Sequence, residues 1–182
     1  MRRRLVSQWN RRLLKRARQL CQYLLLPLLI IVLTIKLHDS LRAPILPADF
    51  ATRSLHTIDG RDLTLAELSA KKPLVVWFWN RWCAACQDSL PLMMRLDGKR
   101  IGVLTVAVRS GDDIGIVRYL QGHHLAVPVV NDSRGELADS WQVTASPTMI
   151  IVAKGEAVST TSGWTSDLGV WIRLWWVRKW QY

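Results

Sequence analysis

Hydrophobic positions are distributed in two different ways along the 182-residue chain. Residues 19–35, QLCQYLLLPLLIIVLTI, form one continuous apolar run without a charge, whereas shorter apolar runs alternate with mixed segments from about Ala51 onward. The long run is at the short end of the roughly 17–25 residues that span a bilayer. Arg18 and Lys36 can snorkel outward and lengthen it. The pattern therefore predicts a transmembrane anchor over residues 19–37.

Two other interpretations of this run were weighed against the anchor. A cleaved signal peptide has an apolar region of about 7–15 residues followed by a small-residue cleavage site. Here the run ends in Lys36-Leu37-His38-Asp39, which has no such site. A buried core helix is disfavoured because eight Lys or Arg residues precede the run. The uncleaved anchor is the interpretation we keep.

Charge is concentrated before the anchor. The net charge is +11, and residues 1–18 contribute +8 of it, because they contain eight basic residues and no acidic one. A basic arm can bind nucleic acid. Here an apolar run follows the arm directly, and the positive-inside rule then places the arm on the cytoplasmic side of a membrane. Residues 38–50 are then a Pro-containing linker, and residues 51–182 are an exported domain. Cys21, at the cytoplasmic edge of the anchor, is interpreted as an apolar filler rather than as an acylation site.

From Ala51 onward the pattern is that of an α/β domain. Two continuous apolar runs, Pro73–Trp79 and Ile101–Val108, have the length and character of strands buried on both faces. The other expected strands form two hairpins, Leu55–Ile58 with Asp62–Leu65 and Thr148–Ala153 with Ala157–Thr161. The expected helices are Leu65–Ala70, Cys83–Leu96, Asp112–Gln121, Asp132–Trp141 and Ser166–Trp180. Strands that alternate with helices predict a βαβ core, closed here by an antiparallel hairpin.

Cys83 and Cys86 form a CxxC pair directly after the first buried strand and at the expected start of a helix. Disulfide exchange needs a thiolate, and the free N–H groups and positive dipole end of a helix N-terminus favour one. Arg81 adds a nearby cation. We therefore predict that Cys83, at the exposed end, attacks substrate disulfides and that Cys86, deeper in the helix, resolves the mixed disulfide.

Three other interpretations of the CxxC pair compete with this one. A structural disulfide over three residues would staple almost nothing. A zinc or copper site needs two more ligands, and His123-His124, which is more typical of a surface helix end, is the only candidate partner. A catalytic Cys–His arrangement has no matching signature. The prediction is thus a redox pair without metal or other cofactor, and a metal-binding or metal-stress module is the alternative.

A second candidate element is Ser146-Pro147, which lies just before the predicted strand Thr148–Ala153. Proline fits the first residue of a strand, and an X–Pro bond can be cis at modest cost. A trans bond is the simpler expectation for an isolated proline. Because this proline occurs together with the upstream Trp82-Cys83-Ala84-Ala85-Cys86, we predict a cis bond that holds the Ser146 backbone beside Cys83. Trp82, Ser146 and Pro147 would then bind the substrate.

At these residues the sequence resembles a known family. The runs VVWFWNRWCAAC and PVVNDSRGELADSWQV, with SPT opening a strand, are similar to membrane-anchored thioredoxin-like proteins, which include the cytochrome-c-maturation reductases. The closing TTSGWTSDLGVWIRLWW is similar to the suppressor-of-copper-sensitivity group, ScsD. The resemblance covers about residues 51–182. It implies a thioredoxin fold, a central mixed sheet flanked by helices, on the periplasmic face of a bacterial inner membrane. It also implies protein disulfide substrates and a transmembrane thiol electron donor.

The chain departs from the thioredoxin pattern at two points. Trp77 stands where thioredoxin has the buried Asp that takes a proton from the resolving thiol, and Glu67 is a weak candidate substitute because it reads as a solvated helix charge. The dipeptide Ala84-Ala85 carries no imidazole that would stabilise the Cys83 thiolate. Both departures disfavour a strong oxidant. The expected function is therefore reduction or isomerisation of protein disulfides, with an oxidase as the alternative.

Tryptophan is concentrated at the C-terminal end, where five of the ten Trp residues lie in the last 19 positions. Interspersed basic residues make this segment similar to a membrane-surface helix. The favoured interpretation is a terminal helix that packs one face on the sheet, through Leu168, Trp171, Ile172 and Trp175. Trp176 and Trp180 would be left for the membrane or a partner.

Overall fold

A computed structural model describes residues 21–41, 43–96, 98 and 100–182. The chain divides into two units, residues 1–41 and residues 42–182, which are described separately below. The predicted basic arm at residues 1–18 lies outside the described residues, as do the first two residues of the predicted anchor.

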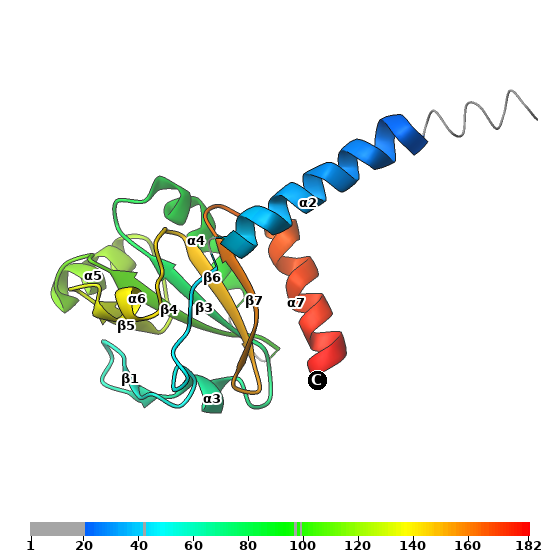
Figure 1. Cartoon of the computed structure of the whole chain (residues 1–182). Coiled ribbons are helices and arrows are strands. Elements are labelled where there is room, and N and C mark those ends of the chain that lie inside the picture. The colour runs from blue at the N-terminus through cyan, green and yellow to red at the C-terminus, as the bar shows by residue number, and fades with distance from the viewer. Residues whose placement is uncertain (1–20, 42, 97, 99) are drawn as a thin grey trace, which may run out of the picture. The chain divides into compact units, whose positions relative to one another are not determined.

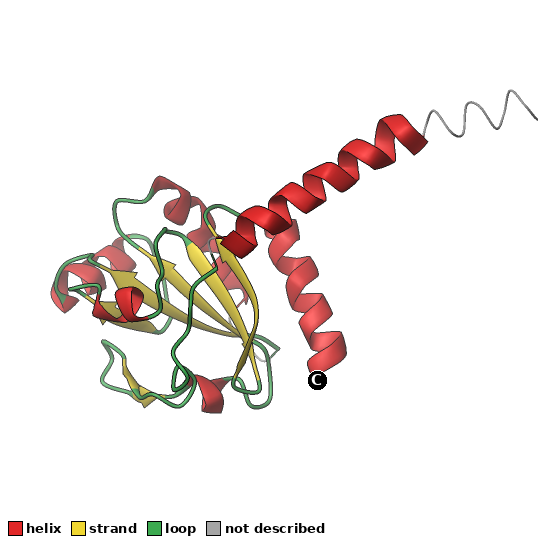
Figure 2. Ribbon diagram, in the orientation of Figure 1, coloured by secondary structure: helices red, strands yellow, loops and turns green. Residues whose placement is uncertain are grey.

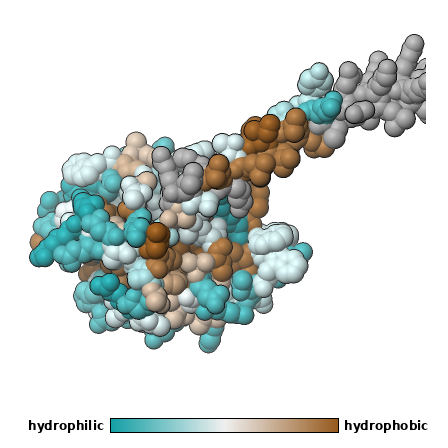
Figure 3. Space-filling model, viewed as in Figure 1, coloured by the Kyte–Doolittle hydropathy of each residue, from teal (hydrophilic) through white to brown (hydrophobic). Residues whose placement is uncertain are grey.

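The described part of the first unit is helical throughout. A π-helical turn, η1 (Cys21–Leu25), leads into helix α2 (Leu26–Leu41). Apolar side chains gather along this helix and are exposed (Figure 3). Within the described residues, none of the helices combines the length and the apolar character that crossing a membrane requires.

The second unit is built on a five-stranded mixed sheet with the strand order β5-β4-β3-β6-β7 (Figures 1 and 2). The strands are β3 (Leu74–Trp79), β4 (Gly102–Val108), β5 (Val129–Asp132), β6 (Thr148–Ala153) and β7 (Glu156–Ser162). Strands β3, β4 and β5 are parallel, whereas β6 and β7 run antiparallel to their neighbours. A separate small hairpin pairs β1 (Leu55–His56) with β2 (Asp62–Leu63), as the sequence predicted.

The central strands are buried on both sides, because helices cover both faces of the sheet. Alternate residues of β3, such as Trp77 and Phe78, therefore enter two different cores. The first core lies under α4 (Ala84–Leu96), α5 (Asp113–Gly122) and α7 (Asp167–Gln181). The second lies under α3 (Leu65–Leu68) and α6 (Glu136–Ser140). Leu46 and Phe50, which the sequence assigned to a linker, pack against this second core.

One strand was missed by the sequence analysis. The predicted helix Asp132–Trp141 instead begins at Glu136, and Val129–Asp132 forms the edge strand β5. Asp132 ends that strand and is buried, and its carboxylate accepts the backbone N–H groups of Leu137 and Ala138 at 3.1 and 2.9 Å. Asp132 thereby caps α6, although it lies five residues before Leu137 in the sequence. Gly135, which directly precedes the helix with a φ of 81°, has no side chain that could do so.

The predicted packing face of the terminal helix was wrong. Helix α7 contacts the sheet through Val170, Leu174 and Val177, which are buried. The four residues expected there, Leu168, Trp171, Ile172 and Trp175, are 46–68% exposed. Two further contacts lie near the start of α7. Asp167, its first residue, pairs with Arg95 of α4 at 2.8 Å, and Gly163, which directly follows β7, donates its N–H to the Pro147 carbonyl at 2.7 Å.

Candidate redox site

Cys83 and Cys86 lie where the central strand β3 passes into helix α4. Cys83 immediately precedes the first helical residue, and the two sulfurs form a disulfide with a Cα–Cα distance of 5.1 Å. Cys83 is half-buried, whereas Cys86 is fully buried in the first core. The two ends of the disulfide therefore differ in access, and only Cys83 can be reached from solvent.

The loop before the pair is held by hydrogen bonds from outside the helix. The Asn80 side chain accepts the Trp82 N–H at 3.1 Å, and the Asn80 carbonyl accepts the Cys83 N–H at 3.3 Å. Ser110, buried just after the neighbouring strand β4, accepts the Arg81 N–H through its hydroxyl at 3.2 Å. These contacts fix the direction in which Cys83 faces.

The helix N-terminus is directed at the outer sulfur. The backbone N–H of Cys86 donates to Sγ of Cys83 at 3.0 Å. Such an N–H, together with the dipole of α4, stabilises negative charge on this sulfur. The guanidinium of Arg81 lies 4.9 Å from the centre of the Trp82 ring, so this cation is stacked on the indole.

The loop from Ala145 to Pro147 forms the opposite wall of the site. The Ser146–Pro147 bond is cis, which confirms the prediction from sequence. The Ser146 carbonyl oxygen lies 3.5 Å from Sγ of Cys83, so this backbone sits beside the outer sulfur as expected. Pro147 itself is buried at the start of β6.

An open groove of about 220 Å³ lies next to the disulfide. Its lining includes Trp82, which is 75% exposed, and Ser146, so two of the three predicted substrate-binding residues meet there. Arg109 also lines it, and this guanidinium is paired with Asp139 at 2.6 Å. The groove is therefore bounded by an exposed indole, the backbone of the Ala145–Ser146 loop and a cation.

The inner side of the disulfide is apolar. Cys86 belongs to the same cluster as Trp77 and Trp79, whose rings stack at 6.1 Å. Trp79 also stacks on Tyr119 of α5 at 5.4 Å. Burial raises the pKa of Tyr119, and the positive charge of Arg81 partly offsets this. Because apolar burial disfavours a thiolate, Cys86 is held as the less reactive partner of the pair.

Comparison with known proteins shows the same architecture. Residues 47–160 match the model of the AhpC/TSA family. A thioredoxin-like protein of Haemophilus influenzae is 32% identical over 136 residues, which cover 75% of this chain and 81% of that protein. Sporulation thiol-disulfide oxidoreductase A of Bacillus subtilis is 28% identical, over 67% of this chain and 75% of that one.

Solved structures agree on the fold. A secreted Mycobacterium tuberculosis disulfide oxidoreductase homologous to E. coli DsbE is 18% identical and superposes with a TM-score of 0.60, covering 70% of this chain and 98% of that one. A putative thioredoxin from Neisseria meningitidis is 20% identical, with a TM-score of 0.63 over 70% and 87% of the two chains.

The chain belongs to the AhpC/TSA family and is a thioredoxin-like thiol–disulfide oxidoreductase. The family match covers the redox motif and the cis-proline loop, which are the parts of this oxidoreductase that the geometry brings together.

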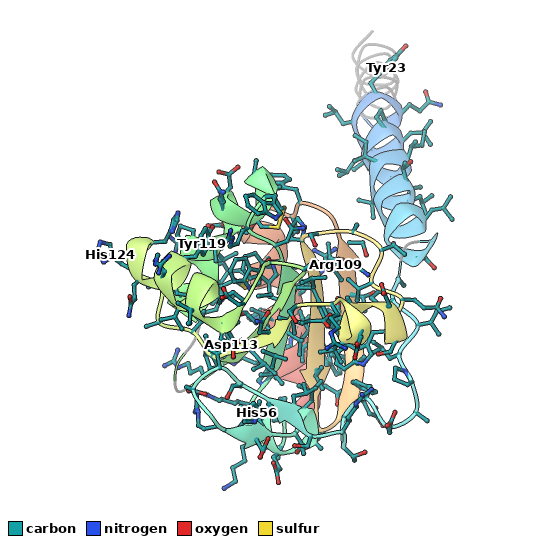
Figure 4. All side chains as sticks on the ribbon, turned by 90° about the vertical axis from the view of Figure 1, so that its left-hand side faces the viewer. Tyr23, His56, Arg109, Asp113, Tyr119 and His124 are labelled. Carbon is teal, nitrogen blue, oxygen red and sulfur yellow. A yellow bond between two sulfur atoms is a disulfide. The ribbon has the colours of Figure 1, made fainter. Side chains whose placement is uncertain are left out.

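The residues considered for a metal site are not assembled in the oxidoreductase. His124 lies at the outer end of α5 (Figure 4), and His123 packs on Tyr119 with ring centres 4.1 Å apart. In the part of the chain that the structure describes, no three His, Cys, Asp or Glu side chains are placed to hold one metal ion. Glu67 is likewise separated from the redox pair. It is exposed on α3, which covers one face of the sheet, whereas Cys86 is buried on the opposite face.

Three contributors to the site were missed from the sequence. Asn80 and Ser110 act through hydrogen bonds to the backbone of the active-site loop, and Arg109 reaches the groove from the end of β4. The carboxyl ends of β3 and β4 are adjacent because the two strands are parallel neighbours. That adjacency is the signal that could have identified Ser110 and Arg109, since loops at this edge of a sheet build the site.

Proposed function

We propose that this oxidoreductase reduces or isomerises disulfides of exported proteins, with Cys83 as the attacking thiol and Cys86 as the resolving thiol. The observation that carries the proposal is the asymmetry of the pair. The half-buried Cys83 Sγ has an N–H at 3.0 Å and the Ser146 carbonyl at 3.5 Å, whereas Cys86 is fully buried beneath it.

The reaction then has two exchange steps. The Cys83 thiolate attacks one sulfur of a substrate disulfide, so that a mixed disulfide forms and a substrate thiolate leaves. Cys86 gives up its proton and attacks Sγ of Cys83, which releases the second substrate thiolate and forms the Cys83–Cys86 disulfide. Two electrons pass from the dithiol to the substrate, and an external dithiol must return them. The extended substrate would lie in the groove between Trp82 and Ser146.

The direction of electron flow follows from how little stabilises the thiolate. A strong oxidant owes its potential to a stabilised reduced form. At Cys83 the stabilising groups are one backbone N–H and the α4 dipole, whereas the Arg81 cation is stacked on the neighbouring Trp82. A helix dipole contributes about 0.3–2 kcal/mol, which corresponds to only tens of millivolts for a two-electron couple. We therefore assign the protein to the reducing side.

The location of the protein is part of the proposal. The basic arm and the apolar run at residues 19–37 support a single-pass anchor in a bacterial inner membrane, with the N-terminus cytoplasmic and the redox domain periplasmic. A transmembrane thiol electron donor would then recharge the pair. Within the family, the Trp-rich C-terminal sequence supports a place in the ScsD group.

The redox state of the pair in cells tests this direction. We expect alkylation trapping of intact cells to find Cys83 and Cys86 mostly as free thiols while the membrane donor is active, and as a disulfide once it is removed. Cys21 has to be replaced by alanine so that only the pair is counted. A pair that is mostly oxidised with the donor intact would overturn the reductase assignment and favour an oxidase.

The anchor is proposed to hold the domain in place without taking part in the chemistry. A fragment that begins at Phe50 should therefore keep its disulfide exchange rate with a small disulfide substrate, within about twofold. Both core clusters lie almost entirely within this fragment, and Phe50 contacts Trp141 with ring centres 6.0 Å apart. The same fragment carrying Cys83→Ala is the control without exchange. A fragment that folds, as judged by circular dichroism, but exchanges much more slowly would show that the first unit contributes to the reaction.

A further inference from the structure

Helix α7 exposes an unusually apolar face to solvent. Val170, Leu174 and Val177 attach the helix to the sheet. At 100° per residue, the opposite side carries large apolar side chains, all 56–68% exposed: Leu168, Ile172, Trp175, Trp176 and Trp180. These five residues are called the α7 outer face below. Exposed apolar side chains scattered singly are ordinary, but a contiguous face marks an interaction surface.

The side chains of the outer face lie close to one another. The rings of Trp175 and Trp176 are 6.4 Å apart, and those of Trp176 and Trp180 are 5.6 Å apart. The helix is packed against the domain at these same turns, because Leu174 and Val177 are only 1% and 5% exposed. The helix thus has a satisfied inner face and a separate aromatic outer face.

Basic groups accompany these indoles. Lys179 lies in the middle of the outer face, with its Nζ 5.1 Å from the Trp175 ring centre and 5.8 Å from that of Trp180. Arg178 is exposed beside it. The one acidic residue of α7, Asp167, is already paired with Arg95 of α4. Among the residues of α7, Lys179 and Arg178 therefore place positive charge beside the tryptophans, and the helix contributes no side-chain carboxylate there.

We propose that the α7 outer face lies in the headgroup region of an anionic lipid bilayer. Indoles are favoured at this depth because they have a large apolar body and one N–H donor, and Lys and Arg beside them attract anionic lipid. A second copy of the chain fits less well, because pairing two such faces would bury Lys179, which lies among the indoles, and α7 offers no carboxylate on this face to pair with it. The proposal builds on the proposed membrane location but not on the redox chemistry.

Photocrosslinking of the full chain in lipid vesicles tests the proposal. Trp176 is replaced by p-benzoylphenylalanine, and the protein is reconstituted into vesicles of equal parts phosphatidylcholine and phosphatidylglycerol. The matched control carries the same group at Ile114, which is 68% exposed on α5. We expect lipid adducts, identified by mass, at position 176 and several times fewer at position 114. Circular dichroism and the intact disulfide verify that each labelled protein is folded.

Charge reversal supplies the second arm. Lys179→Glu in the labelled protein should lower the adduct yield about fivefold, the size of effect that one basic residue has beside an anionic surface. Arg118→Glu changes the net charge equally on an exposed position of α5 and should leave the yield unchanged. Equal loss with both variants would contradict the proposal.

The remaining outcomes each overturn the docking proposal. Covalent dimers at position 176 would assign the face to a second copy. Equal lipid labelling at positions 114 and 176 would show non-specific adsorption. If the protein floats with the vesicles but gives no lipid adducts, the anchor is supported and the lipid contact of α7 is refuted. If the protein does not float, both the anchor and the lipid contact of α7 are refuted. Disulfide exchange measured in the same vesicles reports separately on the proposed redox function.

Discussion

Cys86→Ala should convert the oxidoreductase into a trap for its substrates. The outer sulfur, Cys83, can still attack a disulfide, because its helix N-terminus and the Ser146 backbone are unchanged. The thiol that would release the product is gone, so mixed disulfides should accumulate to nearly one per protein while turnover falls to background. Non-reducing electrophoresis of the purified variant with a protein disulfide substrate, or of cells after acid quenching, measures this directly.

The matched control is Cys83→Ala. Both variants also carry Cys21→Ala, so that the trap keeps only Cys83 and the control keeps only the buried Cys86. We expect no mixed disulfides from this variant, because Cys86 has no exposed surface. Before substrate is added, denatured samples of both variants should react equally with a thiol reagent, which verifies that the remaining cysteine of each is reduced. Equal trapping by the two variants would refute the assignment of roles.

Trp141→Ala should cause a large loss of stability. Trp141 has no exposed surface, and its ring centre lies 5.5 Å from that of Phe78 in the central strand and 6.0 Å from that of Phe50. Removing a buried indole costs the transfer free energy and leaves a cavity, about 3–5 kcal/mol in total. Chemical denaturation of the detergent-solubilised protein, followed by circular dichroism, gives the free energy of unfolding.

Trp176→Ala makes the same chemical deletion on the α7 outer face and serves as the comparison. Trp176 is 58% exposed, so we expect a change of no more than about 0.5 kcal/mol in detergent. Similar losses for the two variants would mean that α7 packs differently from the arrangement described above.

The sequence was most informative where one residue pattern has one structural solution. Continuous apolar runs of strand length predicted the two inner strands β3 (Leu74–Trp79) and β4 (Gly102–Val108), and both were placed correctly. Strand β5 was missed because it is an edge strand of four residues that ends in Asn131 and Asp132, and such a short run with polar residues has no clear period. Only the parallel pairing with β4 makes it a strand.

The face of α7 could not be chosen from the sequence because apolar residues occur on every side of that helix. The largest side chains suggested the inner face, but the space above the sheet is filled by Val170, Leu174 and Val177 instead. In the redox site, the CxxC pair and the cis-proline loop were predicted, since both carry local signatures. Ser110 has no such signature, because it lies 29 residues from the Arg81 N–H that it accepts, and only the folded chain brings the two together. Asn80 accepts the N–H of Trp82 two residues further on, which is a local turn contact that the sequence analysis did not use.

Two contacts connect the segment around the start of α7 with the two walls of the redox site. Gly163 is bonded to the carbonyl of Pro147 in the active-site loop, and Asp167 is paired with Arg95 on the helix that carries the cysteines. If a ligand of α7 changed these two contacts, it would act on both walls of the redox site. By reciprocity, substrate bound in the groove would then change the affinity of that α7 ligand by the same factor. The two contacts are thus a short physical route between the C-terminal helix and the cysteines.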